Sequence, residues 1–212
     1  MAKLPRQPNL DRLRTLEPSL ITLQKGTELH RIYFRGGDHP TRWNAFRYFG
    51  PTSSRFDHHV PDEKGEAQIQ DQGIMYLAAP ALTGLADVFQ ASRTIRRARS
   101  SPWLVSFELQ SDVVLLDLTG KFPVRAGASM KLMSGPTSYA QTWARGFYDV
   151  YAQIEGLYFP SSITNGPAVA LNERAHHNRA IPSTPSFHRA LSDPLLLTPL
   201  RNAARDLGYD LV

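Results

Sequence analysis

The chain has 212 residues, of which 42% are hydrophobic, so it can bury a sizeable core and is not disordered throughout. It contains no cysteine, which excludes disulfide bonds, zinc–thiolate sites and cysteine nucleophiles and fits a reducing cytosol. The formal net charge of +5 favours contact with phosphate groups of some kind.

The first 28 residues are expected to form an arm that precedes the domain. Their opening, MAKLPRQPNLDRLR, lacks the apolar core of a secretory signal, and no apolar run in the sequence is long enough to span a membrane. Within the arm, PSLITLQ predicts a short helix or strand. We therefore expect an N-terminal arm at 1–28 and one domain at 29–212, in the cytoplasm.

In the first part of the domain, the sequence predicts two strands and a helix. LHRIYF, residues 29–34, alternates and is rich in aromatic and β-branched residues, as is typical of a strand. Residues 35–73 are polar and turn-rich, and long loops of this kind are often functional. A second strand is expected at 74–78, followed by a helix from Pro80. The helix has a predicted buried stripe of Leu82, Leu85, Ala86 and Phe89.

The second part predicts more strands, a long helix and a largely helical C-terminus. The helix is expected at 137–154 with core residues Trp143, Phe147 and Tyr151, and the tail at 193–212 is expected to break near Pro199. Residues 176–186 read as a polar loop. Strands are expected at 103–110, 113–120, 156–160 and 167–173. With no repeat and no clear linker, the pattern favours a single α+β domain with a mixed β core and flanking helices.

Several common catalytic motifs are absent. The sequence has no Walker-type phosphate loop, no G-x-G-x-x-G, no G-x-S-x-G and no H-E-x-x-H. The adjacent pairs 58–59 and 176–177 are histidines that would diverge on a strand or helix, so no metal site is expected. The basic cluster RTIRRARSS, residues 93–101, could be a solvated face, a nucleic-acid contact or a contact with another anionic ligand or partner. Its lack of aromatic residues weakens the case for single-strand binding.

Four segments, taken in order, resemble the RES domain family. They are LHRIYF, SSRFDHH, IMYLAAPALTGLADVF and GLYFPSSI, and the resemblance covers roughly residues 28–175. It implies a fold related to that of ADP-ribosyltransferase toxins. It also implies an enzyme that cleaves NAD as its substrate and passes ADP-ribose to water, phosphate or a protein target. Such an enzyme is expected to be the toxin of a toxin–antitoxin module.

The same resemblance implies a cognate antitoxin that inhibits the enzyme. We expect an Xre-like partner with a helix-turn-helix, which binds over the cleft and forms a hetero-oligomer with the toxin. DNA would then be contacted only through the antitoxin, and no membrane partner is expected.

The resemblance also implies five site residues. Arg31 and Arg55 match the family's two arginines and would hold the NAD pyrophosphate, because a guanidinium fork matches phosphate oxygens. Tyr76 would stack on nicotinamide or bond a ribose hydroxyl. Asp87 stands where a glutamate is expected, and its carboxylate would stabilise positive charge on the ribose as the nicotinamide bond breaks. Ser161 would position the nicotinamide amide or the ribose. Arg31, Asp87 and Ser161 are thus the expected catalytic set, and Arg31, Arg55 and Tyr76 the expected substrate-binding set.

Other interpretations remain open from the sequence. Asp87 lies about 140° from the predicted buried stripe of its helix, which by itself favours a solvated charge. Its side chain is one methylene shorter than the expected glutamate, which keeps a non-catalytic RES-like binding protein as an alternative. The basic cluster keeps a nucleic-acid-binding module as another.

Overall fold

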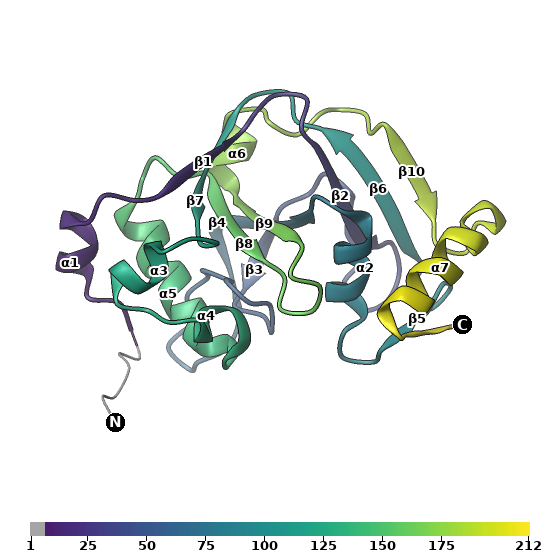
Figure 1. Ribbon diagram of the computed structural model, residues 1–212, viewed down its shortest axis with the longest axis horizontal. Helices are drawn as coiled ribbons and strands as arrows, with labels where there is room; N and C mark the ends of the chain where they lie inside the picture. Colours follow the sequence, from purple (N-terminus) through teal and green to yellow (C-terminus); the bar gives the residue numbers. More distant parts are fainter. Residues whose placement is uncertain (1–6) are drawn as a thin grey trace.

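A nine-stranded sheet runs through the centre of the protein (Figure 1). The computed structural model describes residues 7–212. The strand order is β1-β7-β8-β9-β4-β2-β6-β10, with β3 pairing β4 off this path, and β7 and β8 run parallel. The strands are β1 (Leu20–Leu23), β2 (Glu28–Phe34), β3 (Arg47–Gly50), β4 (Gln68–Ala78), β6 (Pro102–Glu108), β7 (Val113–Asp117), β8 (Gly156–Pro160), β9 (Pro167–Asn172) and β10 (Phe187–Ala190). A separate parallel pair joins β5 (Thr94–Ile95) to β11 (Asp210–Leu211).

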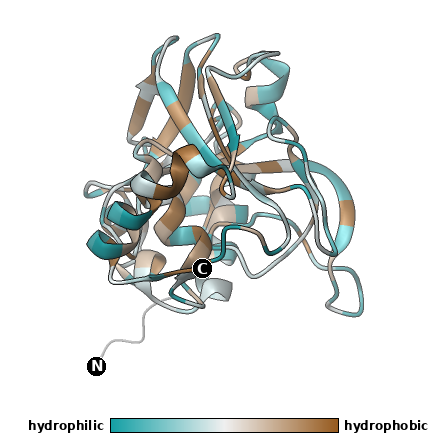
Figure 2. Cartoon of the chain, turned by 90° about the vertical axis from the view of Figure 1, so that its right-hand side faces the viewer, coloured by the Kyte–Doolittle hydropathy of each residue, from teal (hydrophilic) through white to brown (hydrophobic). Residues whose placement is uncertain are grey.

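Two groups of helices cover the sheet. In Figure 1, α3, α4 and α5 lie beside β8, whereas α2 and α7 lie near β2 and β6. The strands and inner helix faces carry most of the hydrophobic residues, while loops and outer helix turns are more hydrophilic (Figure 2). The helices are α1 (Leu10–Thr15), α2 (Ala81–Phe89), α3 (Phe122–Ala126), α4 (Lys131–Ser134), α5 (Thr137–Val150), α6 (Glu173–His177) and α7 (Leu197–Leu207), with a 3-10 turn at Pro194–Leu196.

The sheet splits between β2 and β4. These strands pair at His30 and Ala78, and β3 takes over the pairing with β4 at Ile74. Residues 31–34 of β2 therefore pair with β6 on one side but have no ladder partner on β4. Helix α2 packs over the end of this junction, with Gly84 against Ala78 and Ile32. At this junction β2, which carries Arg31, lies next to β4, which carries Tyr76.

The fold-class prediction is confirmed, because the chain forms one mixed sheet with flanking helices. The expected strands at 29–34 and 74–78 and the long helix are present, and Trp143, Phe147 and Tyr151 lie in the core. In α2 the buried stripe includes Thr83 in place of Leu82, which is only partly buried.

Three local predictions were wrong. Residues 35–73 are not all loop, because they contain β3 and the first half of β4. Residues 173–177 form α6, and the short strand β10 follows the predicted loop. Pro199 does not break the C-terminal helix, because it lies in the first turn of α7, where its missing N–H has no helical partner to lose.

The described part of the predicted arm packs on the domain. Leu13 of α1 is fully buried, and the Tyr151 hydroxyl donates hydrogen bonds to the carbonyls of Leu13 and Leu16 at 2.9 and 3.1 Å. Strand β1 pairs with β7. Residues 1–6 of the arm lie outside the described residues. Within residues 7–212, no helix combines the length and apolar character needed to cross a bilayer.

Candidate active site

Asp87 and Ser161, two of the predicted site residues, meet between α2 and the turn that joins β8 and β9. Pro80 precedes the helix, where a residue without N–H fits well. Thr83 and Asp87 lie one turn apart and so share a face, which packs on the turn between β8 and β9. The Ser161 hydroxyl donates a hydrogen bond to Asp87 Oδ1 at 2.5 Å, and the hydroxyls of Thr83 and Thr164 lie 2.9 Å apart. The contact joins residues 74 positions apart in the sequence.

The turn holds the Ser161 hydroxyl in one orientation. Its oxygen accepts hydrogen bonds from the backbone N–H groups of Ile163 and Thr164 at 3.1 and 3.3 Å, so its proton is directed at Asp87. Ser161 is buried, with 4% of its surface exposed. The arrangement leaves the hydroxyl without a histidine to activate it as a nucleophile, which suits a positioning role.

The Asp87 carboxylate is half-buried rather than solvated. Burial raises its pKa above the ordinary value, and the hydrogen bond from Ser161 partly offsets this rise. No basic side chain among residues 7–212 forms an ion pair with it. A carboxylate held by one hydroxyl and no cation keeps its negative charge available for a positive group that develops nearby.

Tyr76 and Arg55 form a second contact within the predicted set. The Tyr76 hydroxyl donates to the Arg55 carbonyl at 2.8 Å, and burial raises the Tyr76 pKa well above its ordinary value. The Arg55 guanidinium donates to the carbonyls of Leu132 and Gly135 at 3.0 and 2.9 Å, and burial lowers its pKa. Arg55 therefore ties its own loop to α4, and no hydrogen bond or ion pair joins its side chain to Asp87 in the described residues.

Arg31 lies apart from both pairs. Alternation along β2 places its side chain on the same side as Leu29 and Tyr33, opposite the side on which Ile32 meets α2. Its guanidinium donates to the carbonyls of Trp43 and Ala45 at 2.7 and 2.9 Å. Burial lowers the Arg31 pKa to about 10, so the group stays charged at neutral pH. Arg31 thus fastens the loop that follows β2 at the split in the sheet.

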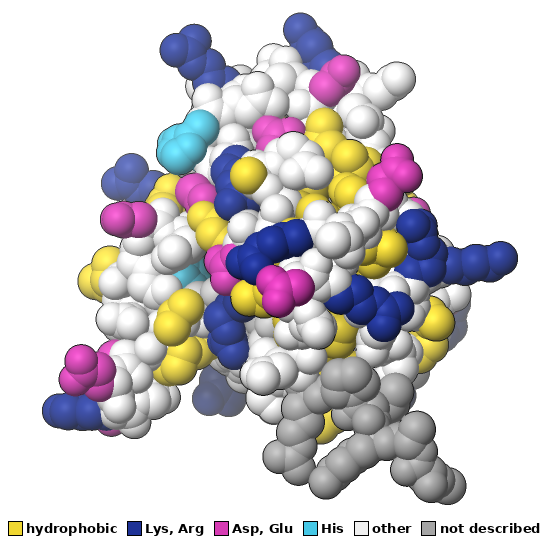
Figure 3. Space-filling view, turned by 90° about the vertical axis from the view of Figure 1, so that its left-hand side faces the viewer, with side chains coloured by type: hydrophobic (Ala, Val, Ile, Leu, Met, Phe, Trp, Pro, Cys, Tyr) yellow, Lys and Arg dark blue, Asp and Glu magenta, His cyan; other side chains and the backbone are white. Residues whose placement is uncertain are grey.

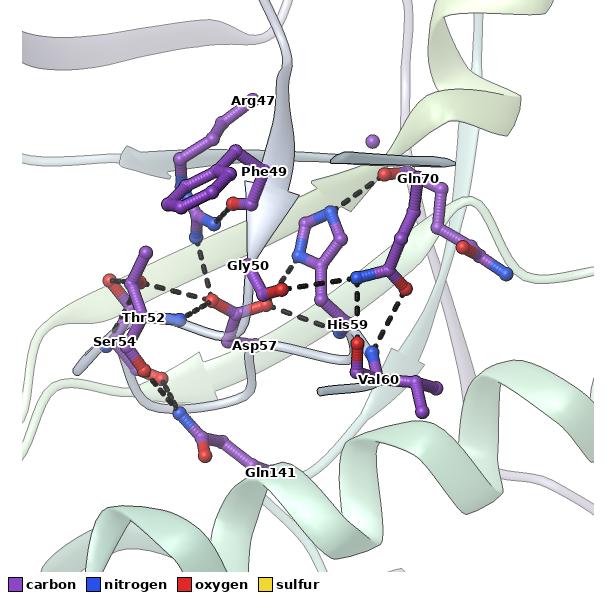
Figure 4. A network of polar contacts seen from close by, with 12 residues as sticks. Arg47, Phe49, Gly50, Thr52, Ser54, Asp57, His59, Val60, Gln70 and Gln141 are labelled. Carbon is purple, nitrogen blue, oxygen red and sulfur yellow. Dashed lines mark hydrogen bonds and ion pairs between the residues drawn. The ribbon is translucent and has the colours of Figure 1, made fainter. Parts of the chain in front are cut away.

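A buried ionic network supports the loop that carries Arg55 (Figure 4). Asp57 is fully buried, and its carboxylate contacts His59 Nδ1 at 2.5 Å and Arg47 at 2.9 Å. Thr52 donates to the same carboxylate through its backbone N–H at 2.7 Å. Burial alone would raise the Asp57 pKa, but the hydrogen bonds and the Arg47 charge outweigh it and hold the pKa well below its ordinary range. The side-chain amide of Gln141 in α5 donates hydrogen bonds to the carbonyls of Thr52 and Ser54 and so attaches the loop to this helix.

Sequence reasoning missed this network, although its signal was present in the segment SSRFDHH. Asp57 and His59 of this segment form one part of the network, whereas the arginine that pairs with Asp57 is Arg47, ten positions earlier, and not Arg55. Within residues 7–212, no group of three or more His, Asp or Glu side chains is arranged so that it could hold a metal ion.

The basic cluster at 93–101 is partly structural. Arg97 donates to the carbonyls of Leu191, Ser192 and Asp193, and Arg93 lies 5.5 Å from the Tyr209 ring centre. Figure 3 shows another face of the molecule, the left-hand side of Figure 1, on which basic side chains are interspersed with acidic and hydrophobic ones. Arg93 and Arg97 of the cluster are thus engaged by other parts of the fold.

Comparison with known proteins identifies the family. The RES domain matches residues 28–191. The chain belongs to the RES domain family. This RES protein is also similar in structure to a chain of the M. tuberculosis MbcT–MbcA toxin–antitoxin complex, with a TM-score of 0.57 and 19% sequence identity. The match covers 91% of this chain and 96% of that chain. No curated protein matches the sequence.

Proposed function

We propose that this RES protein is the toxin of a toxin–antitoxin module and that it consumes NAD by cleaving the nicotinamide–ribose bond. ADP-ribose would pass to water, phosphate or a protein target. The observation that carries the proposal is the 2.5 Å contact between Asp87 and Ser161 in a member of the RES family. Family membership supports NAD cleavage as the reaction. The contact with Ser161 provides a half-buried, fixed carboxylate that would stabilise positive charge on the ribose.

The chemistry needs a negative charge beside the ribose. As the bond to nicotinamide breaks, positive charge builds on the ribose ring, as in glycoside hydrolysis. An ionised Asp87 would stabilise that charge, and its partial burial strengthens the attraction relative to water. Ser161 would hold the carboxylate in place. The short aspartate side chain is compatible with this role because the β8–β9 turn docks directly on its helix face.

The two arginines would act on the pyrophosphate from their fixed positions. The hydrogen bonds of Arg31 and Arg55 to carbonyls all use the same terminal nitrogen, Nη1. Within residues 7–212, Nη2 and Nε of each guanidinium make no hydrogen bond, so they would be left for phosphate oxygens. Tyr76 uses its hydroxyl on the Arg55 carbonyl, so it would contribute the face of its ring to the ligand.

The test is product analysis with NAD labelled in its adenylate half. Free ADP-ribose indicates hydrolysis, ADP-ribose-1-phosphate indicates phosphorolysis, and label retained on protein indicates transfer. Asp87→Asn keeps the size of the side chain and removes its charge, and we expect it to lower the rate by about a hundredfold or more. Asp149→Asn, at an exposed position of α5, is the matched control and should leave the rate unchanged. Equal rates for the two variants would refute the role of Asp87.

The proposed partner is a cognate antitoxin of the Xre type, which would contribute any contact with DNA. Support comes from the family and from the similar chain, which was crystallised in a toxin–antitoxin complex. Expression of the chain alone should arrest growth, and co-expression of its cognate antitoxin should restore it. If Asp87→Asn were as toxic as the unaltered chain, toxicity would not depend on the proposed chemistry.

A further inference from the structure

A pocket of about 530 Å³ opens beside the end of β2, away from the Asp87–Ser161 contact. Its size falls within the range of small-molecule and cofactor sites. The carbonyls that Arg31 holds belong to the loop that forms one wall. The lining residues are Tyr33, Arg35, Thr41, Arg42, Trp43 and Asn44.

Two aromatic side chains of the pocket are held in place by their neighbours. The Trp43 ring packs against Phe107 with ring centres 5.7 Å apart. Tyr33 is 2% exposed, and its hydroxyl lies 2.6 Å from His188 Nε2 and accepts a hydrogen bond from Arg35 at 2.9 Å. Tyr33 is buried and supports Arg35, whereas Trp43 is partly exposed. An aromatic surface that is already ordered, as in Trp43, loses little entropy when a flat ring stacks on it.

The charge of the pocket is positive. Arg35 and Arg42 are exposed, and neither forms an ion pair within residues 7–212. Arg35 lies flat on Trp103, 3.8 Å from the ring centre, and this contact with its hydrogen bond to Tyr33 fixes its direction. The lining contains no acidic residue. A ligand that combines an aromatic ring with phosphate groups matches this combination of side chains.

We propose that this pocket binds the adenosine diphosphate half of the dinucleotide, with the phosphate next to the adenosine on Arg35 and Arg42 and the base on Trp43. The second phosphate of the pyrophosphate is then left for Arg31, which holds the loop of the pocket wall, and for Arg55. The assignment to NAD rests on the proposed function, whereas the affinity for a base–phosphate ligand does not. The oxidised nicotinamide ring carries a positive charge, which the two arginines disfavour, so the opposite half of the molecule takes this pocket. The nicotinamide half is then left for the side of β2 that carries Asp87.

The test measures binding without cleavage. ADP and nicotinamide mononucleotide are titrated by calorimetry into the Asp87→Asn protein and into the same protein carrying Arg42→Gln or Trp43→Ala. These two changes leave the backbone carbonyls held by Arg31 in place. We expect ADP to bind, to compete with NAD, and to lose about tenfold or more in affinity in each variant. Arg201→Gln on α7 is the exposed control and should bind ADP like the parent.

The remaining measurements keep folding and function separate. Trp43→Phe retains a ring and should bind ADP more tightly than Trp43→Ala, and thermal unfolding reports whether each variant folds. Absence of ADP binding, equal ADP affinity in the folded variants, or ADP binding without competition with NAD would each overturn the proposal. Because no cleavage is measured, these outcomes differ from a failure of nicotinamide release, which would count against the proposed function alone.

Discussion

Ser161→Ala should shift the pH dependence of NAD cleavage in a defined direction. In the proposed mechanism Asp87 acts in its ionised form, so activity should fall as the pH drops through the Asp87 pKa. Burial raises this pKa, and the Ser161 hydrogen bond lowers it. Removal of the hydroxyl eliminates the lowering contribution only. The acid limb of kcat/KM should therefore move to higher pH.

The size of the shift follows from the contact itself. A hydrogen bond to a charged group contributes about 1.5–3 kcal/mol. Since one pKa unit corresponds to about 1.4 kcal/mol, the acid limb should move up by roughly one to two pH units. Partial exposure of Asp87 to solvent places the expected value toward the lower end.

The assay is the initial rate of nicotinamide release at low NAD concentration, measured from acidic to mildly basic pH. Ser162→Ala removes the exposed hydroxyl of the next residue and serves as control, with an unmoved acid limb. An acid limb that stays in place in Ser161→Ala, or moves to lower pH, would show that Ser161 does not stabilise the charged form of Asp87.

Two further predictions concern stability and the docking of the turn. Burial, with the nearby charge of His59, lowers the His58 pKa from 6.5 to about 4. Between pH 6.5 and pH 4, His58 is protonated in the unfolded chain but remains neutral in the folded chain. The free energy of unfolding should therefore fall by about 3 kcal/mol when the pH is lowered from above 6.5 to 4. His58→Phe keeps the stacking on Tyr148 and should reduce the dependence of the free energy of unfolding on pH, as measured by urea unfolding, whereas His177→Phe at an exposed position should not. The same pH dependence in both variants would contradict the burial of neutral His58. Gly166→Ala would place a methyl group against the Thr83 hydroxyl and should lower both Tm and the rate of NAD cleavage. The methyl group of Gly120→Ala would come no closer than 4.0 Å to its nearest neighbour, the Asp117 carboxylate, and should change neither. Unchanged activity in Gly166→Ala would argue that the turn need not dock on α2.

The parts of the fold with a regular hydrophobic pattern could be predicted from the sequence. α5 buries one face, so its apolar residues recur at helical spacing, and β2 is rich in the aromatic and β-branched residues that favour a strand. The first half of β4 has no such pattern, because residues 68–72 form an exposed hairpin with β3 and alternate only between exposed and half-buried positions. β10 is four residues long and half-buried throughout, which leaves no pattern to detect.

The candidate site was only partly predictable for a different reason. The helical position of Asp87 indicated a solvated charge, and only the resemblance to the RES family suggested otherwise. Its partner, Ser161, comes from a turn that reaches α2 through the strand order of the sheet, and pairing of distant strands leaves no local trace. The partners of Arg31 are backbone carbonyls, which any residue type can supply.

Arg31 holds the loop after β2 through hydrogen bonds to its carbonyls, so a substitution at Arg31 changes the loop as well as the charge. A variant such as Arg31→Ala releases two carbonyls and allows the 41–45 segment to relax, so substrate could be lost without any direct contact having been removed. Lysine would keep the charge but present a single ammonium point in place of a planar fork. Inactivity of either variant would therefore leave open whether the guanidinium touches NAD or only shapes the wall beside it. A bound-ligand structure with Arg31 intact would distinguish the two roles.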